Sequence, residues 1–302
     1  MHKSVLLEES INSLNLKDNS IIVDCTLGYG GHSSEILKRI PNGHLYSFDQ
    51  DIDAITFSDN RLSKISNNYT IIKSNFENIK EKLQEIGIDK VDGIIYDLGV
   101  SSPQLDQDDR GFSFHKDAKL DMRMDKSSEF SALNVVNEYT QEELTDIFFK
   151  YGEEKFARNI AKNIVKNRPI KTTLELVDVI KEAVPMKYKL DHHPARKTFQ
   201  AIRIEVNREL EVFEKSLKDA LALLNSGGRV CVITFHSLED RICKDIFKSV
   251  STVNKELQNL PIIPDNYLPK YKIIKSIKPS KKEVEENKRA RSAKLRIIER
   301  IG

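Results

Sequence analysis

Cysteine is scarce in this sequence. Its 302 residues include only three cysteines, Cys25, Cys231 and Cys243, which are scattered and stand in apolar segments. An odd number without regular spacing favours reduced thiols in a core over a disulfide framework or a zinc site. We therefore expect no structural metal.

Long apolar runs are also missing. No stretch approaches the roughly 20 residues of a membrane-spanning helix. Residues 1–10 lack a basic region followed by a long apolar one, and Glu8 and Glu9 would interrupt the core of a signal peptide. The sequence therefore predicts a cytoplasmic protein without a membrane role.

Neither sign of charge dominates, since the net charge is only +2, but the charges are unevenly distributed. Residues 270–302 hold 12 Lys/Arg against 4 Asp/Glu, and residues 150–210 hold 14 against 8. Such runs are often only solvated faces. Two basic regions on an otherwise acidic chain also fit a polyanionic substrate. In that case Arg196, Lys197, Arg203 and Lys288–Arg291 are expected to contact RNA.

The first hundred residues alternate short β-branched runs with longer amphipathic stretches. This pattern is typical of βαβ units around a parallel sheet, so the predicted fold class is α/β with a doubly wound, Rossmann-like sheet. The predicted strands are Ile21–Cys25, His44–Asp49, Tyr69–Ser74 and Val91–Leu98, and the predicted helices are Ser33–Ile40, Asp51–Ile65 and Glu77–Ile86.

The pattern changes after Ser101. Leu144, Ile147 and Phe148 recur at helical spacing, and we expect residues 106–194 to form an inserted, mainly helical domain that recognises the substrate. The sheet domain would then comprise residues 1–105 and 195–302. Its second part is predicted to contain a helix at Arg208–Leu224, a turn at Ser226–Gly228, a strand at Arg229–Phe235, a helix at Ser237–Val250, and a hairpin of Tyr271–Ile274 with Leu295–Ile298.

A glycine-rich segment lies directly between the first strand and its helix. Gly28, Gly30 and Gly31 would let a ligand approach the backbone beyond the carboxyl end of the strand. A dinucleotide fingerprint needs a third glycine where this chain has Ser33, which argues against nicotinamide or flavin. The alternative is that the glycines only form a tight turn.

Acidic and aromatic residues follow the other strands. Asp49 ends the second strand, where a carboxylate can accept hydrogen bonds from both ribose hydroxyls, and Asp51 competes for this role. Phe76 follows the third strand and is a candidate to pack on adenine, although a core role is nearly as plausible. Asp97 ends the fourth strand. Together these positions predict an adenosyl-cofactor site.

Longer motifs span nearly the whole chain, and through them the sequence closely resembles a known family, the bacterial small-subunit (16S) ribosomal RNA cytosine-N4 methyltransferases of the RsmH/MraW type. The matching stretches are residues 26–33 (TLGYGGHS), 97–106 (DLGVSSPQLD), 110–114 (RGFSF), 120–125 (LDMRMD), 151–154 (YGEE), 196–204 (RKTFQAIRI) and 235–241 (FHSLEDR).

The resemblance implies a class I methyltransferase sheet with an inserted helical domain and the cofactor S-adenosylmethionine. It also implies methylation of the N4 amine of a decoding-site cytosine, cytosine 1402, on the RNA or the 30S subunit. A homodimer is compatible with the family, although nothing in the composition predicts one. The implied cofactor contacts are Gly30, Gly31, His32, Asp49, Phe76, Asp97 and Gln104.

Methyl transfer to this amine needs in-line positioning and an acceptor for its protons. Our hypothesis is that Asp97 is the catalytic acceptor. Many amino-methyltransferases place two prolines and an aromatic after this position, whereas this chain continues Leu98-Gly99-Val100. The aromatic surface for the base must therefore come from elsewhere.

Residues after the fourth and fifth strands are candidates for binding the target base. Phe112 and Phe114 could stack on a flipped base or instead anchor the insertion to the sheet. Asp121, Arg123 and Asp125 could equally form an internal ion-pair network. His236 directly follows an apolar strand and is expected at the edge of the site. The residues expected to read the pyrimidine edge are Ser101, Ser102, Asp106 and Arg110.

Two other classes of function remain open. One is a methyltransferase for a protein or small-molecule amine, for which the basic insertion has no evident use. The other is a non-catalytic RNA-binding or ribosome-assembly factor that keeps the fold. A test of cofactor binding followed by a test of methyl transfer separates them.

Overall fold

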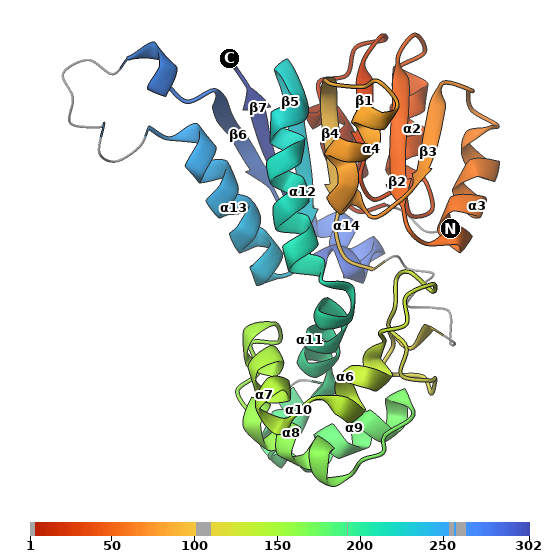
Figure 1. Ribbon diagram of the computed structural model, residues 1–302, viewed down its shortest axis with the longest axis vertical. Helices are drawn as coiled ribbons and strands as arrows, with labels where there is room; N and C mark the ends of the chain where they lie inside the picture. The colour runs from red at the N-terminus through yellow and green to blue at the C-terminus, as the bar shows by residue number, and fades with distance from the viewer. Residues whose placement is uncertain (1–3, 101–109, 192, 254–256, 258–263) are drawn as a thin grey trace. The chain divides into compact units, whose positions relative to one another are not determined.

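The computed structural model describes residues 4–100, 110–191, 193–253, 257 and 264–302. The chain divides into two compact units, shown in Figure 1. Unit 1 comprises Met1–Gly99 and Leu210–Gly302, and unit 2 comprises Val100–Glu209. The predicted insertion, residues 106–194, lies inside unit 2.

Unit 1 is built on a seven-stranded sheet of order β3-β2-β1-β4-β5-β7-β6. The first five strands in this order are parallel, and β7 runs antiparallel to both β5 and β6. The strands are β1 (Ile21–Asp24), β2 (His44–Asp49), β3 (Tyr69–Lys73), β4 (Val91–Asp97), β5 (Leu224–Thr234), β6 (Tyr271–Ile277) and β7 (Lys294–Arg300). The doubly wound sheet and the C-terminal hairpin are both confirmed.

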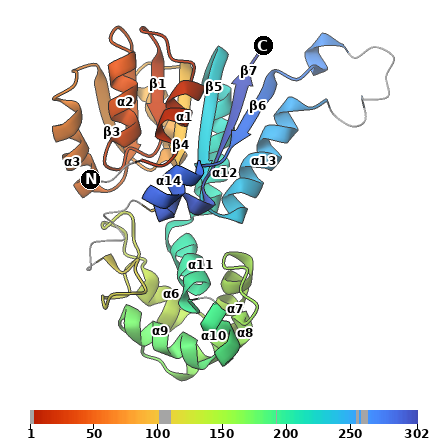
Figure 2. The same cartoon turned by 180° about the vertical axis from the view of Figure 1, so that it is seen from behind.

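Helices cover both faces of this sheet. Figure 1 shows α4, α12 and α13 on the near face, and Figure 2 shows α1 and α14 on the other face. The helices are α1 (Leu7–Ser13), α2 (Gly31–Arg39), α3 (Ile52–Leu62), η1 (Phe76–Asn78), α4 (Ile79–Glu85), α12 (Glu209–Leu223), α13 (Ser237–Ser251), η3 (Asp265–Tyr267), α14 (Lys281–Glu286) and η4 (Lys288–Ser292).

The central strands are apolar because both of their faces are buried. Tyr96 of β4 packs in the cluster under α4, α12 and α13, whereas Ile95 points into the cluster under α1 and α2. The three cysteines lie buried in these two clusters, as expected. Among the described helices, none has the length and apolarity needed to cross a membrane.

The predicted turn at Ser226–Gly228 is wrong. These residues belong to β5, where the pairing with β4 jumps from Val91–Leu224 to Gly93–Arg229. Three extra residues therefore bulge from the strand, and Gly227 takes a positive φ of 81° within the bulge. Glycine marks a bulge inside a strand as readily as a turn before one.

Unit 2 is helical, with helices α6 (Ala132–Glu138), α7 (Gln141–Lys150), α8 (Ala157–Lys166), α9 (Thr173–Glu182), α10 (Met186–Asp191) and α11 (Ala195–Asn207). Thr140 and Thr172 begin α7 and α9 with capping boxes. The unit extends beyond residue 194 because Phe199 and Ile202 of α11 are buried in its core. Its helices thus form around their own hydrophobic cluster.

Candidate functional site

The predicted cofactor residues of unit 1 gather at one edge of the sheet. Parallel strands end on the same side, so Asp24 of β1, Asp49 of β2 and Asp97 of β4 stand at neighbouring carboxyl ends. His236 follows β5 at the same edge. In open α/β sheets this edge is where ligands bind.

The glycine loop connects β1 to α2 in a conformation that side chains would disturb. Gly30 caps α2 with a φ of 71°, and a Cβ on it would lie 3.1 Å from Ser58 Oγ. A Cβ on Gly31 would lie 1.9 Å from Ser4 Oγ. The glycines therefore allow the loop to pack against Ser58 and Ser4 as it leads into a nine-residue helix, and the N-terminus of a helix suits a polar ligand group.

Asp49 supports this loop from β2. Its Oδ2 accepts a hydrogen bond from Gly28 N (2.9 Å) and its Oδ1 accepts one from Asp51 N (2.9 Å). Burial raises the pKa of Asp49 to about 6. Asp51 instead caps α3 by accepting from Asp53 N (3.1 Å). Of the two competing carboxylates, Asp49 is the one that contacts the glycine loop.

Asp97 and His32 face each other at the center of the edge. His32 Nδ1 lies 3.5 Å from Asp97 Oδ2. Burial, reinforced by the negative charges of Asp24 and Glu239, raises the pKa of Asp97 to about 8, and burial lowers the pKa of His32 to about 4. Among the described residues, neither Asp97 Oδ1 nor His32 Nε2 has a hydrogen-bond partner, although both atoms are buried. Such orphaned polar atoms are expected where a ligand supplies the partner.

Two further carboxylates, Asp24 and Glu239, surround Asp97. The sequence placed Glu239 among polar residues that favour a site edge after an apolar strand, but it linked neither carboxylate to Asp97. Asp24 accepts hydrogen bonds from Ser33 Oγ (2.7 Å) and Thr26 N (3.0 Å), and burial raises its pKa. Thr26 Oγ1 also accepts from Asp97 N (2.7 Å), which ties β1 to β4. A role for Asp24 at this edge could have been inferred from its position as the last residue of an apolar strand.

Glu239 is the second of these carboxylates and is only 3% exposed. It completes a capping box with His236 at the start of α13, and its Oε2 accepts from Phe235 N (2.7 Å). Its place three residues after the cap was a readable capping-box signal. Its charge reaches Asp97, which the sequence did not indicate.

Phe76 opens η1 after β3 and is half-buried. Its ring meets Tyr96 edge to face with centroids 5.6 Å apart, and its carbonyl accepts from Ser216 Oγ (2.8 Å). The ring is therefore held in a fixed orientation at the site edge, with Asn75 capping the turn ahead of it.

His236 is mostly buried, with 12% of its side chain exposed. Its Nδ1 accepts from Glu239 N (3.5 Å), while Nε2 lies 3.1 Å from Glu239 Oε1 without forming a hydrogen bond. His236 is thus both a helix cap and a residue of the carboxyl edge.

The remaining predicted substrate residues belong to unit 2 or lie outside the described residues. Ser101, Ser102 and Asp106 are in the second group, and the predicted cofactor contact Gln104 also lies outside the described residues. Arg110 is 3% exposed, and its guanidinium donates to the carbonyls of Arg123 (3.0 Å) and Met124 (3.3 Å).

The two predicted aromatics differ in their burial. Phe112 is 6% exposed and belongs to the unit 2 core, whereas Phe114 is half-buried and stacks on His193 with centroids 4.4 Å apart. Phe112 therefore packs inside its own unit. Stacking of a base by either ring stays a prediction.

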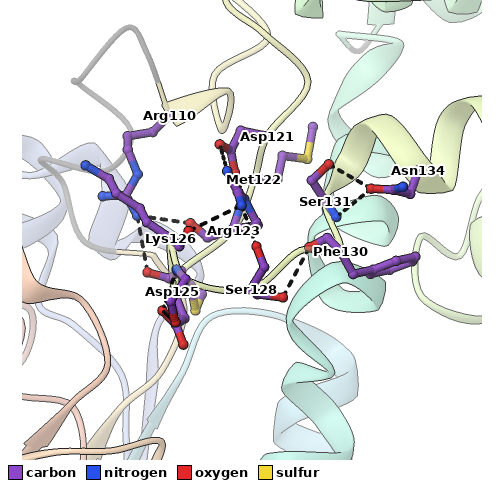
Figure 3. A network of polar contacts seen from close by, with 12 residues as sticks. Arg110, Asp121, Met122, Arg123, Asp125, Lys126, Ser128, Phe130, Ser131 and Asn134 are labelled. Atoms are coloured by element: carbon purple, nitrogen blue, oxygen red, sulfur yellow. Dashed lines mark hydrogen bonds and ion pairs between the residues drawn. The ribbon is translucent and has the colours of Figure 1, made fainter.

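The acidic and basic residues that follow form an internal network, drawn in Figure 3. Arg123 pairs with both oxygens of Asp121 (2.7 and 2.8 Å) and also donates to the carbonyls of Lys126 (3.3 Å) and Ser128. Asp125 Oδ1 accepts from Ser127 N (2.9 Å). Of the two alternatives for these residues, the structure shows the ion-pair network.

The residues of the two basic regions differ in whether their side chains are held by contacts within the protein. Arg203 forms a two-pronged ion pair with Glu209 (2.8 and 2.9 Å), and Lys197 Nζ donates to Glu153 O (2.7 Å). In contrast, Lys281, Lys282, Lys288 and Arg291 of unit 1 have exposed side chains. Within the described ranges, no three His, Cys, Asp or Glu side chains gather as metal ligands.

The strand order, the glycine loop and the row of strand-end carboxylates together define the class I, Rossmann-like methyltransferase architecture. The chain belongs to the MraW methylase family, whose model matches residues 1–301. The predicted family and its S-adenosylmethionine-dependent methyltransferase class are thereby confirmed.

Curated relatives match over nearly their whole length. Proteins named "Ribosomal RNA small subunit methyltransferase H" are 52% identical in Finegoldia magna and 53% identical in Clostridioides difficile. The matches cover 99% of this chain and 98% and 99% of those relatives, respectively. A solved rRNA methylase from Streptococcus thermophilus aligns over 100% of this chain and 99% of its own, at 13% identity and a TM-score of 0.46, a likeness too weak to carry an argument.

Proposed function

We propose that this protein transfers a methyl group from S-adenosylmethionine to the N4 amine of the decoding-site cytosine, cytosine 1402, in 16S ribosomal RNA. The observation that carries the proposal is the Asp97 carboxylate, which has a buried oxygen without a partner in the described part of the chain. The names of the relatives support ribosomal RNA of the small subunit as the substrate.

The residues at the carboxyl edge fit this cofactor. Its sulfonium and amino groups are cationic, and the edge presents the carboxylates of Asp24, Asp49 and Asp97. Gly30 and Gly31 let the loop pack closely on Ser58 and Ser4 as it enters α2, and Asp49 is placed to accept from the ribose hydroxyls while it holds the loop. Phe76 offers a ring for the adenine. We propose these residues, with His32, as the cofactor site, together with Gln104, which lies outside the described residues.

Bound there, the cofactor supplies an electrophilic methyl group. The N4 lone pair of cytosine would bond to this methyl carbon as the carbon–sulfur bond breaks, and the electron pair of that bond would leave on the sulfur of S-adenosylhomocysteine. The nitrogen then loses a proton. Asp97 would accept a hydrogen bond from the amine through Oδ1 and orient its lone pair. A carboxyl whose pKa is about 8 is also a better proton acceptor than an ordinary aspartate.

We further propose that unit 2 takes part in RNA recognition. Its loop from Arg110 to Ser131 is held by the Asp121–Arg123 pair, and Asn207 donates to Met122 O (2.8 Å) and accepts from Met124 N (2.8 Å). A loop so constrained presents its exposed groups in one arrangement, which lowers the ordering cost of binding.

The test uses small ribosomal subunits from cells that lack this methylation, the purified protein and S-adenosylmethionine labelled in its methyl group. We expect label in a single cytosine of the 16S RNA, recovered as N4-methylcytidine after digestion. Label in another base or in protein would contradict the proposal. Cofactor binding without any transfer would indicate the non-catalytic alternative. Free RNA is assayed in parallel with assembled subunits.

A further inference from the structure

Two buried polar atoms stand at the ends of adjacent parallel strands. One is Oδ1 of Asp97, the last residue of β4, and the other is Nε2 of His236, two residues beyond β5. The two strands pair through Asp97 and Ile233. Among the described residues, neither atom has a hydrogen-bond partner. Buried polar groups are nearly always satisfied in native proteins, so two orphans at one ligand-binding edge indicate groups that a ligand completes.

The hydrogen-bonding role of His236 follows from its cap. Because Nδ1 accepts the amide N–H of Glu239, the ring must carry its proton on Nε2 in the neutral form. Glu239 Oε1 lies 3.1 Å from Nε2 and favours a proton there, although the N–H does not point at it. The neutral imidazole is thus a donor at Nε2, and the Asp97 carboxylate is an acceptor once it is ionised.

We infer that His236 is a specificity-determining residue that donates its Nε2–H to N3 of the target cytosine while Asp97 accepts from N4. The inference deepens the proposed function and rests on it. Cytosine presents a donor at N4 beside an acceptor at N3, which complements an acceptor and a donor side by side. Uracil presents O4 and N3–H, the opposite pattern, and would leave both protein groups unpaired.

The decisive experiment combines a protein variant with an atomic change in the RNA. The variant is His236→Asn, because asparagine keeps the helix cap but lacks the ring N–H. The RNA carries 3-deazacytidine at the target, in which N3 is replaced by C–H. The four combinations form a double-mutant cycle, and any intrinsic effect of the deaza base cancels between the two proteins. Both the single-turnover rate and RNA affinity with S-adenosylhomocysteine are measured.

We expect each single change to lower RNA affinity or rate by about tenfold and the double change to cost little more than either one. His236→Asn should also reduce the preference for a target cytosine over a target uracil in the affinity assay. His44→Asn is the matched control, since His44 begins β2 at the opposite edge and bonds Thr70 Oγ1 (2.9 Å). His44→Asn should change neither the effect of 3-deazacytidine nor the preference for cytosine over uracil.

Independent, multiplying effects of the two changes would overturn the inference, as would an unchanged preference for cytosine. These outcomes leave the proposed function intact, because wild-type protein would still methylate the unmodified cytosine. If wild-type protein methylates no cytosine, the proposed function fails, and the inference fails with it. Cofactor affinity, measured by calorimetry, should be the same in wild type and His236→Asn. A loss of cofactor affinity would identify a variant whose site is misfolded.

Discussion

The Glu154 and Arg203–Glu209 region of unit 2 differs from the carboxyl edge of unit 1 in how its buried polar groups are partnered. In unit 2, Arg203 is paired with Glu209, and Glu154, only 1% exposed, accepts from Phe156 N (2.9 Å) and Tyr188 Oη (2.7 Å). In unit 1, Asp97 and His32 each keep a buried atom without a partner among the described residues. The named carboxylates of unit 2 have their partners, whereas the carboxyl edge of unit 1 leaves these two atoms without one. The contrast is between these two regions, since His193 Nδ1 and Thr198 Oγ1 of unit 2 are also buried without a hydrogen-bond partner among the described residues.

This difference distinguishes charged groups that stabilise the fold from charged groups that can bind a ligand. A buried charge with all its partners present stabilises one conformation and has little capacity for a ligand. A buried charge that lacks a partner destabilises the fold, and it persists where a ligand or a reaction uses it. We therefore expect the carboxyl edge of unit 1 to be the functional region, and changing one group of each kind tests this expectation.

The largest effect should come from Asp97→Asn. We expect methyl transfer in a single turnover to fall on the order of a thousandfold, because the amide is a poor proton acceptor. Cofactor affinity, measured by calorimetry, should change much less. Asp92→Asn is the matched control at the other end of β4, where Asp92 accepts from Ile21 N (2.9 Å). If Asp97→Asn keeps the wild-type rate, the catalytic role of Asp97 is excluded.

The next effect concerns the ion pair of unit 2. Arg203→Ala leaves the mostly buried Glu209 without this ion pair, and we expect a loss of about 3 kcal/mol in the free energy of unfolding, measured in urea. Replacing Arg203 with Met and Glu209 with Leu together should restore most of this loss. If the single variant is as stable as the wild type, the pair is not the structural element that the comparison requires.

A smaller effect should appear in the pH dependence of stability. The pKa of Asp97 is raised to about 8, far above its ordinary value, so the folded state holds an extra proton and loses stability as pH rises through this value. Between pH 7 and pH 9, without cofactor, Asp97→Asn should lose about 1 kcal/mol less than wild type. His32 titrates below this range.

Asp121→Asn provides the contrast from unit 2. Although burial alone would raise the pKa of Asp121, its hydrogen bonds with Arg123 lower it below the ordinary value. Asp121 is therefore ionised throughout the interval, and its variant should follow the wild-type slope. Equal slopes for Asp97→Asn and wild type in thermal denaturation would contradict the raised pKa.

The smallest effect is expected from surface charge. Reversal of Lys281, Lys288 and Arg291 to Glu should weaken RNA binding several-fold at low salt and reduce its salt dependence, because fewer phosphate contacts release fewer counterions. Reversal of Lys17, Lys64 and Lys80, equally exposed in unit 1, is the matched control. Equal affinities for the two triple variants would show that net charge, and not this basic surface, governs binding.

Much of the sheet was predictable because its signals are local. The strands from Ile21 to Leu98 were evident from β-branched runs between amphipathic stretches. The predicted hairpin of Tyr271–Ile274 with Leu295–Ile298 lies where β6 and β7 pair. The bulge at Ser226–Gly228 was not, because two glycines are compatible with a turn or a bulge until the partner strand is known. Arg203 was expected to contact RNA, but its pairing with Glu209 became visible only in the structure.

The sequence by itself determined the glycine loop and the strand-end positions of Asp49 and Asp97, since strand alternation and the rules of parallel sheets depend on neighbours along the chain. Tertiary structure decided what those groups can do. It placed Glu239 and Asp24, from separate segments, near enough to shift the pKa of Asp97. It also left Asp97 Oδ1 and His236 Nε2 without partners in the described residues. Burial and pairing depend on residues distant in sequence, so only the folded chain reveals which buried polar groups lack a partner among the described residues.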